Sequence, residues 1–235
     1  MSRASRFHDG DVSGLMRERS RAHRAAVAPD PGGPPVPETP SHAPAALLVM
    51  DLQNAIVARL GDDADAVLDR AAAAVAAARA NGVPVVFVRV AFRPGMPEVS
   101  PRNKAFGGIR ASAAADAFAD PDATAIDPRV APADDEVVVT KRRVSAFAGS
   151  DLDVALRAGG IKELVLCGIA TSGVVLSTLR QAADLDYRLT VLRDACADAD
   201  AEVHRVLTEK VFPRQAEVVD VAHWAAAPTA AAPAA

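Results

Sequence analysis

Ala45-Ala46-Leu47-Leu48-Val49-Met50-Asp51 is the stretch that decides the fold, because six consecutive apolar residues end directly at a carboxylate. An apolar run of this length without alternation is typical of a parallel strand buried on both faces. Similar short runs recur along the chain and alternate with amphipathic stretches, as in a parallel sheet covered by helices. The sequence therefore predicts an α/β protein, a three-layer α/β/α sandwich with a central, mainly parallel sheet of five or six strands.

The expected elements follow from these runs and from the signals that end them. Strands are predicted over 45–50, 83–88, 136–140, 164–167, 189–192 and 216–219. Helices are predicted over 64–80, 152–158, 172–185 and 201–211, with Asn81-Gly82 and Gly159-Gly160 as stop signals and Asp151 as an N-terminal cap. Residues 91–109 are predicted to be a long loop of the kind that serves as a lid or a binding loop.

One domain is predicted over residues 45–222, between two tails. Residues 1–44 carry seven prolines and mixed charge without a sustained apolar period, which predicts a disordered or partner-docking extension. Residues 223–235 form an Ala/Pro-rich run that is predicted to be unstructured.

Composition and charge exclude several functional classes. The net charge is −4 and the basic residues are scattered, so the footprint of a nucleic-acid-binding protein is missing. No apolar stretch is long enough to span a membrane and the amino terminus has no secretory core, which predicts a cytoplasmic protein. Cys167 and Cys196 lie in apolar segments without metal-binding spacing and are interpreted as reduced core thiols.

Three features fall at the ends of predicted strands, where open parallel sheets carry their functional groups. Asp51 follows the first strand, Lys141 follows the third, and the turn 168–174 leads from the fourth strand into a helix. A carboxylate, an amine and a helix amino terminus are therefore expected to converge on one small volume.

Each feature also has a purely structural interpretation, which stays open on these residues alone. Asp51 is equally suited to cap the turn that follows it. Lys141 is able to begin a basic surface loop, although a chain with 22 arginines and only four lysines favours a specific need for an amine there. The turn 168–174 is compatible with plain strand-to-helix geometry, because it matches no phosphate-binding or dinucleotide fingerprint.

Three blocks of the chain resemble the signature blocks of isochorismatase-like hydrolases. They are the stretches 47–54, 141–152 and 168–195, they occur in the family's order and roughly its spacing, and the resemblance spans about residues 44–222. In the family, the block resembled by 168–175 reads glycine, two small or apolar residues, threonine, two variable residues, cysteine and valine. Aligned in this way, the position of the cysteine nucleophile is Val174, whereas Asp51 and Lys141 match the family's acid/base aspartate and its lysine.

The resemblance implies a layout for the whole site. The Ile169–Ala170 peptide would be cis, and the N–H groups of Ala170 and Val174 would form an oxyanion or anion pocket. Thr171, Ser172 and Gly173 would complete that pocket. A substrate pocket is predicted from four further residues, Gln53, Phe92, Phe106 and Phe147.

No metal and no cofactor are predicted, because the histidines that bind metal in nicotinamidase-like members have no counterpart in 89–94. The predicted partner is a small-molecule substrate, without nucleic acid or membrane, and the resemblance implies a homo-oligomer, a dimer or tetramer.

The valine decides the chemistry that is expected. A hydrocarbon side chain has no lone pair for attack on a carbonyl, so the family's thiol chemistry is disfavoured, and Cys167 is not expected to replace it. The leading hypothesis is a hydrolase that acts on a small, carboxylated metabolite by acid/base chemistry at Asp51, with hydrolysis of a vinyl ether as the best guess. The alternatives are a catalytically silent member that binds a metabolite or partner protein through the same pocket, and a purely structural subunit.

Overall fold

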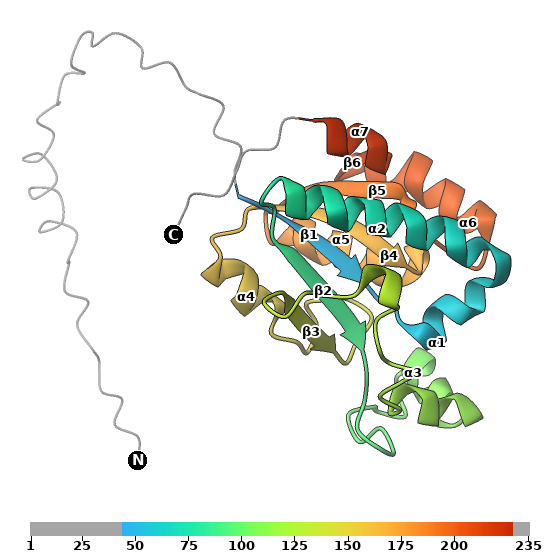
Figure 1. The fold of residues 1–235 in the computed structure, drawn as a ribbon. Coiled ribbons are helices and arrows are strands. Elements are labelled where there is room, and N and C mark those ends of the chain that lie inside the picture. The colour runs from blue at the N-terminus through green and yellow to red at the C-terminus, as the bar shows by residue number, and fades with distance from the viewer. Residues whose placement is uncertain (1–43, 228–235) are drawn as a thin grey trace, which may run out of the picture. The chain divides into compact units, whose positions relative to one another are not determined.

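The computed structural model describes residues 44–227 of the 235-residue chain. These residues fold around one sheet of six strands, in the order β3-β2-β1-β4-β5-β6, in which all neighbours are parallel (Figure 1). The strands are β1 Ala45–Met50, β2 Val85–Val90, β3 Val137–Lys141, β4 Glu163–Ile169, β5 Arg188–Ala197 and β6 Glu217–Val219. The predicted sandwich is confirmed, and the higher of the two predicted strand numbers is right.

Seven α-helices accompany the sheet within the described residues. They are α1 Asn54–Val57, α2 Ala64–Ala80, α3 Lys104–Arg110, α4 Leu152–Ala158, α5 Leu176–Asp184, α6 Ala201–Val206 and α7 Val221–Ala226. Helices α2 and α7 pack together on one face of the sheet, and α4 and α5 lie on the other (Figure 1). Helices α1 and α3 lie beyond the arrowheads of β1 and β2, at the carboxyl-terminal edge of the sheet (Figure 1).

The first strand lies at the centre of the core, as its composition predicts. Ala46 to Met50 are at most 1% exposed, because β2 and β4 flank the strand and helices cover both faces. Burying an aliphatic side chain of this kind contributes roughly 1.5–3 kcal/mol. The strand thereby fixes the place at which Asp51 leaves the sheet.

Several element boundaries differ from those predicted. Strand β5 continues to Ala197, past Arg193 and Asp194, because Cys196 and Ala197 still pair with Gly168 and Ile169 of β4. The predicted helix 172–185 begins as a π-helical turn over Thr171–Val175 before α5. The predicted helix 201–211 likewise changes from α6 into a π-helical turn over Leu207–Val211.

Three short helices were not predicted, because each is too short for a helical period to show. Helix α1 directly follows the first strand, and α3 lies inside the segment predicted to be a plain loop over 91–109. The side chain of Asn103 starts α3 by accepting a hydrogen bond from the backbone N–H of Phe106 at 3.1 Å. Helix α7 extends to Ala226, so the predicted tail over 223–235 begins within a helix.

The predictions for the two ends of the chain fall mostly outside the described residues. This holds for the extension over 1–44 except Pro44, and for the tail from 228 onward. Between residues 44 and 227, no helix combines the length and the apolar character needed to cross a membrane.

Gly168 explains why glycine stands near the end of β4. Its φ is +139°, and a Cβ added there would overlap the carbonyl oxygen of Met50 and lie 2.8 Å from the carbonyl carbon. Backbone atoms in a central strand have no room to move away, so Gly168→Ala should lower the free energy of unfolding by about 3 kcal/mol. Urea denaturation measures this loss. The matched variant is Gly108→Ala in α3, where an added Cβ meets nothing within 4 Å and stability should hold or rise slightly. An equal effect of both substitutions would contradict the steric explanation.

Candidate active site

The carboxyl group and the amine predicted to converge do meet. Asp51 follows β1 and Lys141 ends β3, and the Lys141 side chain spans the width of β2 to place Nζ 2.8 Å from Asp51 Oδ2. The two residues are only 4% and 2% exposed. Lys141 Nζ also donates to the carbonyl of Arg143 at 3.1 Å. Lys141 is therefore not part of a surface loop, and Asp51 is not a helix cap, because Gln53 occupies the N-cap position of α1.

The Asp51 carboxyl has one occupied and one free oxygen. Oδ2 faces Lys141, whereas Oδ1 is buried without a hydrogen-bond partner among the described residues. Burial raises the pKa of Asp51 above its ordinary value, and the Lys141 ammonium opposes the rise without cancelling it. The backbone of Asp51 is also left-handed, with φ of +56°, a conformation that aspartate tolerates better than most residues. The site therefore holds a carboxyl group that keeps its proton to higher pH than an exposed aspartate and has one oxygen without a hydrogen-bond partner.

The turn 170–174 leaves the sheet beside Asp51, because the β1–β4 register pairs Met50 with Gly168. The Ile169–Ala170 peptide is cis, as the resemblance implied. The backbone N–H groups of Gly173 and Val175 both donate to the carbonyl of Ala170, at 3.0 and 3.3 Å. These bonds close the π-helical turn around Val174, which is 2% exposed.

Three residues predicted for the anion pocket already have other partners. The Thr171 hydroxyl lies 2.8 Å from Nδ1 of His204, and the Ser172 N–H donates to Oδ2 of Asp198 at 2.7 Å. The Gly173 N–H is used within the turn, as described above. The N–H groups of Ala170 and Val174 therefore remain as the predicted donors for a bound anion.

Neither cysteine is placed to act as a nucleophile. Cys167 is fully buried and its thiol contacts the carbonyl of Leu48 at 3.5 Å, and burial raises its pKa. Burial also raises the pKa of Cys196 to about 12. A thiol that stays protonated in an apolar core is inert.

The Gln53 side chain bonds to backbone groups around the site, which leaves its amide engaged within the protein. Its amide nitrogen donates to the carbonyls of Val90 and Thr124 at 2.9 and 3.0 Å, and its amide oxygen accepts from the Val90 N–H at 2.7 Å. With 1% of its surface exposed and its amide groups engaged by backbone, Gln53 ties the ends of β1 and β2 to the segment around 124. Its prediction as a substrate-contacting residue has no support in this geometry.

The three predicted pocket aromatics separate into two places. Phe92 and Phe106 pack edge to face with ring centroids 5.3 Å apart, in a small apolar cluster beyond the end of β2 that also contains Phe118. Phe147 instead packs 6.0 Å from Tyr187, which precedes β5 at the opposite, amino-terminal edge of the sheet. The structure brings Phe92 and Phe106 together but does not place Phe147 with them.

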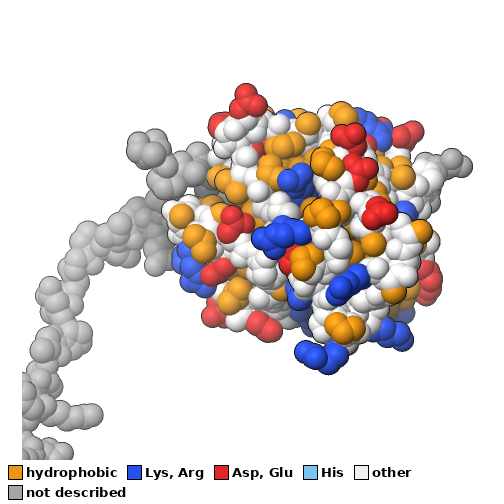
Figure 2. Space-filling view, turned by 90° about the horizontal axis from the view of Figure 1, so that it is seen from below, with side chains coloured by type: hydrophobic (Ala, Val, Ile, Leu, Met, Phe, Trp, Pro, Cys, Tyr) orange, Lys and Arg blue, Asp and Glu red, His pale blue; other side chains and the backbone are white. Residues whose placement is uncertain are grey.

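Cations gather next to Lys141, around a single glutamate. Oε1 of Glu98 lies 2.7 Å from Arg93 and 3.5 Å from Arg142, and the Glu98 carbonyl accepts from Arg143 at 3.0 Å. Among the described side chains, which leave out residues 62 and 63, Arg143 has no ion-pair partner. The face towards which β2 points accordingly shows Lys and Arg side chains across its middle (Figure 2).

Two residues that contact the turn, Asp198 and His204, were not predicted from the sequence. Asp198 directly follows β5, and its position past a strand end was the signal that pointed to Asp51. His204 lies on α6 and no spacing in the sequence links it to Thr171.

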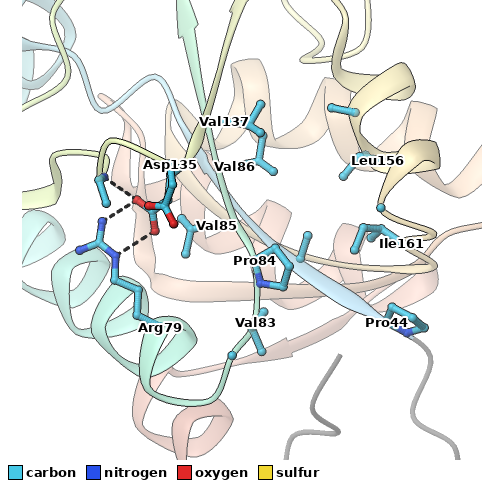
Figure 3. Close-up of a pocket in the computed structure, with 16 residues that line it drawn as sticks. Pro44, Arg79, Val83, Pro84, Val85, Val86, Asp135, Val137, Leu156 and Ile161 are labelled. Carbon is cyan, nitrogen blue, oxygen red and sulfur yellow. Dashed lines mark hydrogen bonds and ion pairs between the residues drawn. The ribbon is translucent and has the colours of Figure 1, made fainter. Parts of the chain in front are cut away.

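A hollow of about 600 Å³ lies away from these residues, at the amino-terminal edge of the sheet. Pro84, Val85 and Ile161 point into it, and an Arg79–Glu136 ion pair lies at its rim (Figure 3). Its lining includes neither Asp51, Lys141 nor the turn 170–174, so it is not the pocket predicted from the strand ends. In the described part of the chain, no three His, Cys, Asp or Glu side chains come together as metal ligands.

Comparisons with known proteins agree on one family. The model of the isochorismatase domain matches residues 45–223. The isochorismatase family protein YecD of Escherichia coli O157:H7 is 36% identical over 179 residues, which cover 75% of this chain and 92% of YecD. The ureidoacrylate amidohydrolase RutB of Methylobacterium radiotolerans is 33% identical over 233 residues, covering 90% and 89% of the two chains. The solved structure of an isochorismatase family protein from Burkholderia thailandensis superposes with a TM-score of 0.65 at 31% identity, covering 76% and 92%.

Proposed function

The chain belongs to the isochorismatase family, and from this membership we propose that it hydrolyses a small, carboxylated metabolite by acid/base chemistry at Asp51 without a thiol nucleophile. The observation that carries the proposal is the buried Asp51–Lys141 pair, with its 2.8 Å contact and its free Oδ1. This pair stands beside the turn in which the resemblance aligns Val174 with the family's cysteine, and the proposal adopts that alignment.

The proposed reaction is hydrolysis of a vinyl ether, with isochorismate as the best candidate substrate. Protonated Asp51 gives its proton to the terminal carbon of the enol ether, which leaves an oxocarbenium ion. Water adds to that ion and returns a proton to Asp51, and the resulting hemiketal breaks into pyruvate and an alcohol. Besides the substrate, the reaction consumes only water. A carboxyl group whose pKa is raised by burial suits the first step, because it keeps its proton to higher pH than an exposed aspartate does.

An amide substrate of the kind named for RutB is not proposed for this chain. Attack on an amide through a covalent intermediate needs a nucleophile at the turn, and the Val174 side chain has no lone pair. The two cysteines stand in the core with raised pKa values and do not replace it.

The carboxylated substrate is inferred from local charge. Lys141, Arg142 and Arg143 are consecutive, and among the described side chains Asp51 and Glu98 are the only carboxylate partners of this group. When Asp51 is protonated, the site keeps an excess of positive charge. Guanidinium and ammonium groups bind carboxylates well in such partly buried surroundings.

The proposal is tested by incubating the full-length protein with isochorismate and coupling pyruvate release to lactate dehydrogenase. We expect turnover that survives pretreatment with iodoacetamide. Turnover lost on alkylation would overturn the thiol-free mechanism. Binding of isochorismate without turnover would instead identify a catalytically silent member of the family.

Val174→Cys tests whether position 174 is the place of the family nucleophile. We expect the variant to gain a thiol that reacts with iodoacetamide, and to gain hydrolysis of activated esters or amides that the wild-type chain lacks, because the turn would supply both nucleophile and oxyanion donors. The matched variant is Val175→Cys, one residue further along the turn. Equal gains in both variants, or none in either, would contradict the assignment of position 174.

A further inference from the structure

We propose that Asp198 and His204 are positioning residues that hold the turn 170–174 in its working conformation from outside the site. The proposal rests on the function proposed above, because the turn carries the donors expected to face the substrate. It assigns a role to two residues that lie on neither β1, β3 nor the turn itself.

The two contacts fall on consecutive residues of the turn. Asp198 accepts a hydrogen bond from the Ser172 N–H at 2.7 Å, and His204 Nδ1 lies 2.8 Å from the Thr171 hydroxyl. Thr171 and Ser172 stand between Ala170 and Val174, whose N–H groups are the predicted anion donors. A displacement of Thr171 or Ser172 is therefore expected to displace the N–H groups of Ala170 and Val174 as well.

The contact of Asp198 with the turn is strong enough to fix the position of Ser172. The bond from Ser172 to a carboxylate is charge-assisted, and it neutralises the positive end of the helix that follows. Because Ser172 already has this partner, a substrate anion is directed to the Ala170 and Val174 side of the turn. Asp198 thus anchors the turn and also limits the N–H groups that are left for a bound anion.

The Thr171 hydroxyl depends on His204 for its hydrogen-bond partner. Thr171 is fully buried, and Nδ1 of His204 is the only partner of its hydroxyl among the described residues. The hydroxyl is able to donate only while Nδ1 keeps its lone pair. Burial lowers the pKa of His204, and the Asp198 carboxylate opposes this, so the neutral ring is favoured at physiological pH.

Helix α6 provides the rigid base for the histidine. Asp200 caps the helix by accepting from the N–H groups of Glu202 and Val203 at 2.9 and 3.2 Å. One turn later, the hydroxyl of Thr208 donates to the His204 carbonyl at 2.9 Å. The imidazole is therefore presented from a capped helix that contacts the turn directly.

The test compares His204→Leu with His204→Asn, because asparagine places a hydrogen-bonding group near the position of Nδ1 and leucine does not. We expect His204→Leu to shift the backbone amide resonances of Ser172 to Val174 and to lower kcat about tenfold with KM changed less than about twofold. His204→Asn should restore the amide shifts and most of kcat. His223→Leu, at an exposed position of α7, is the matched control and should change neither.

A second variant approaches the same contact from the other side. Thr171→Val keeps the shape of threonine and removes the hydroxyl, so it should perturb the turn as His204→Leu does, and the double variant should be no worse than either single one. Wild-type amide shifts in His204→Leu, no rescue by asparagine, or additive effects in the double variant would each overturn the proposal. If the wild-type chain releases no pyruvate, the function proposed above fails, and the amide shifts still decide whether His204 positions the turn.

Discussion

Asp51→Asn is expected to lower kcat for vinyl-ether hydrolysis about 10³-fold, within the 10²–10⁴ range that a positioned general acid supplies. Asparagine keeps the size of the side chain and a hydrogen-bond acceptor for Lys141, but it has no acidic proton to transfer to carbon. The loss should therefore appear in kcat, with substrate binding nearly unchanged. Pyruvate release under saturating substrate measures it.

Asp186→Asn is the matched control for this variant. Asp186 shares the left-handed backbone of Asp51, with φ of +65°, but it is exposed and lies before β5 at the opposite edge of the sheet. The control should keep wild-type kcat. An Asp51→Asn protein that retains more than about a tenth of wild-type kcat would show that Asp51 is not the acid.

Lys141→Met is expected to lower the free energy of unfolding by about 3–5 kcal/mol, because it removes one partner of a buried ion pair, and the Asp51 carboxyl must then either stay charged without its partner or take up a proton. Lys141 is 2% exposed, so water does not replace the lost ammonium. The pKa of Asp51 should rise further in this variant, since Lys141 is the group that opposes its rise. Urea denaturation at neutral pH measures the loss of stability.

Arg157→Met gives the comparison for an exposed pair. Arg157 lies 2.8 Å from Asp153 on α4, with side chains 63% and 41% exposed, and its loss should change stability far less than the loss of Lys141 because water screens the exposed pair. The double variant Asp51→Leu with Lys141→Met should recover part of the stability, because no unpaired charge remains. A Lys141→Met protein as stable as Arg157→Met would contradict the buried ion pair.

The layers of the fold and the central pair were predictable because both follow from local sequence. The run 45–50 is long and apolar enough to place a buried strand, and parallel strands all end at one edge. Asp51 and Lys141 therefore had to leave the sheet on the same side. The convergence of the two side chains was predicted from the strand ends, and the structure adds that Lys141 reaches across β2 to within 2.8 Å of Asp51.

The surroundings of the Asp51–Lys141 pair were less predictable, because they depend on the path that the chain takes after each strand or helix ends and on tertiary packing. Phe147 follows Lys141 closely in sequence, but its segment runs along α5, with the Ala146 N–H donating to Thr178, and reaches Tyr187 at the other edge. Gln53 stands two residues from Asp51, but its amide completes backbone hydrogen bonds. His204 is distant in sequence and meets Thr171 through tertiary packing alone.

The pH dependence of kcat/KM for pyruvate release tests most directly whether Asp51 works as a protonated acid. Because burial raises the pKa of Asp51 in the folded chain, activity should be full at low pH within the stable range and should fall as pH rises through that raised pKa. The falling limb should be absent from the residual activity of Asp51→Asn. A rate that instead increases with pH through the carboxyl range would mean that Asp51 must lose its proton first, and would contradict the mechanism.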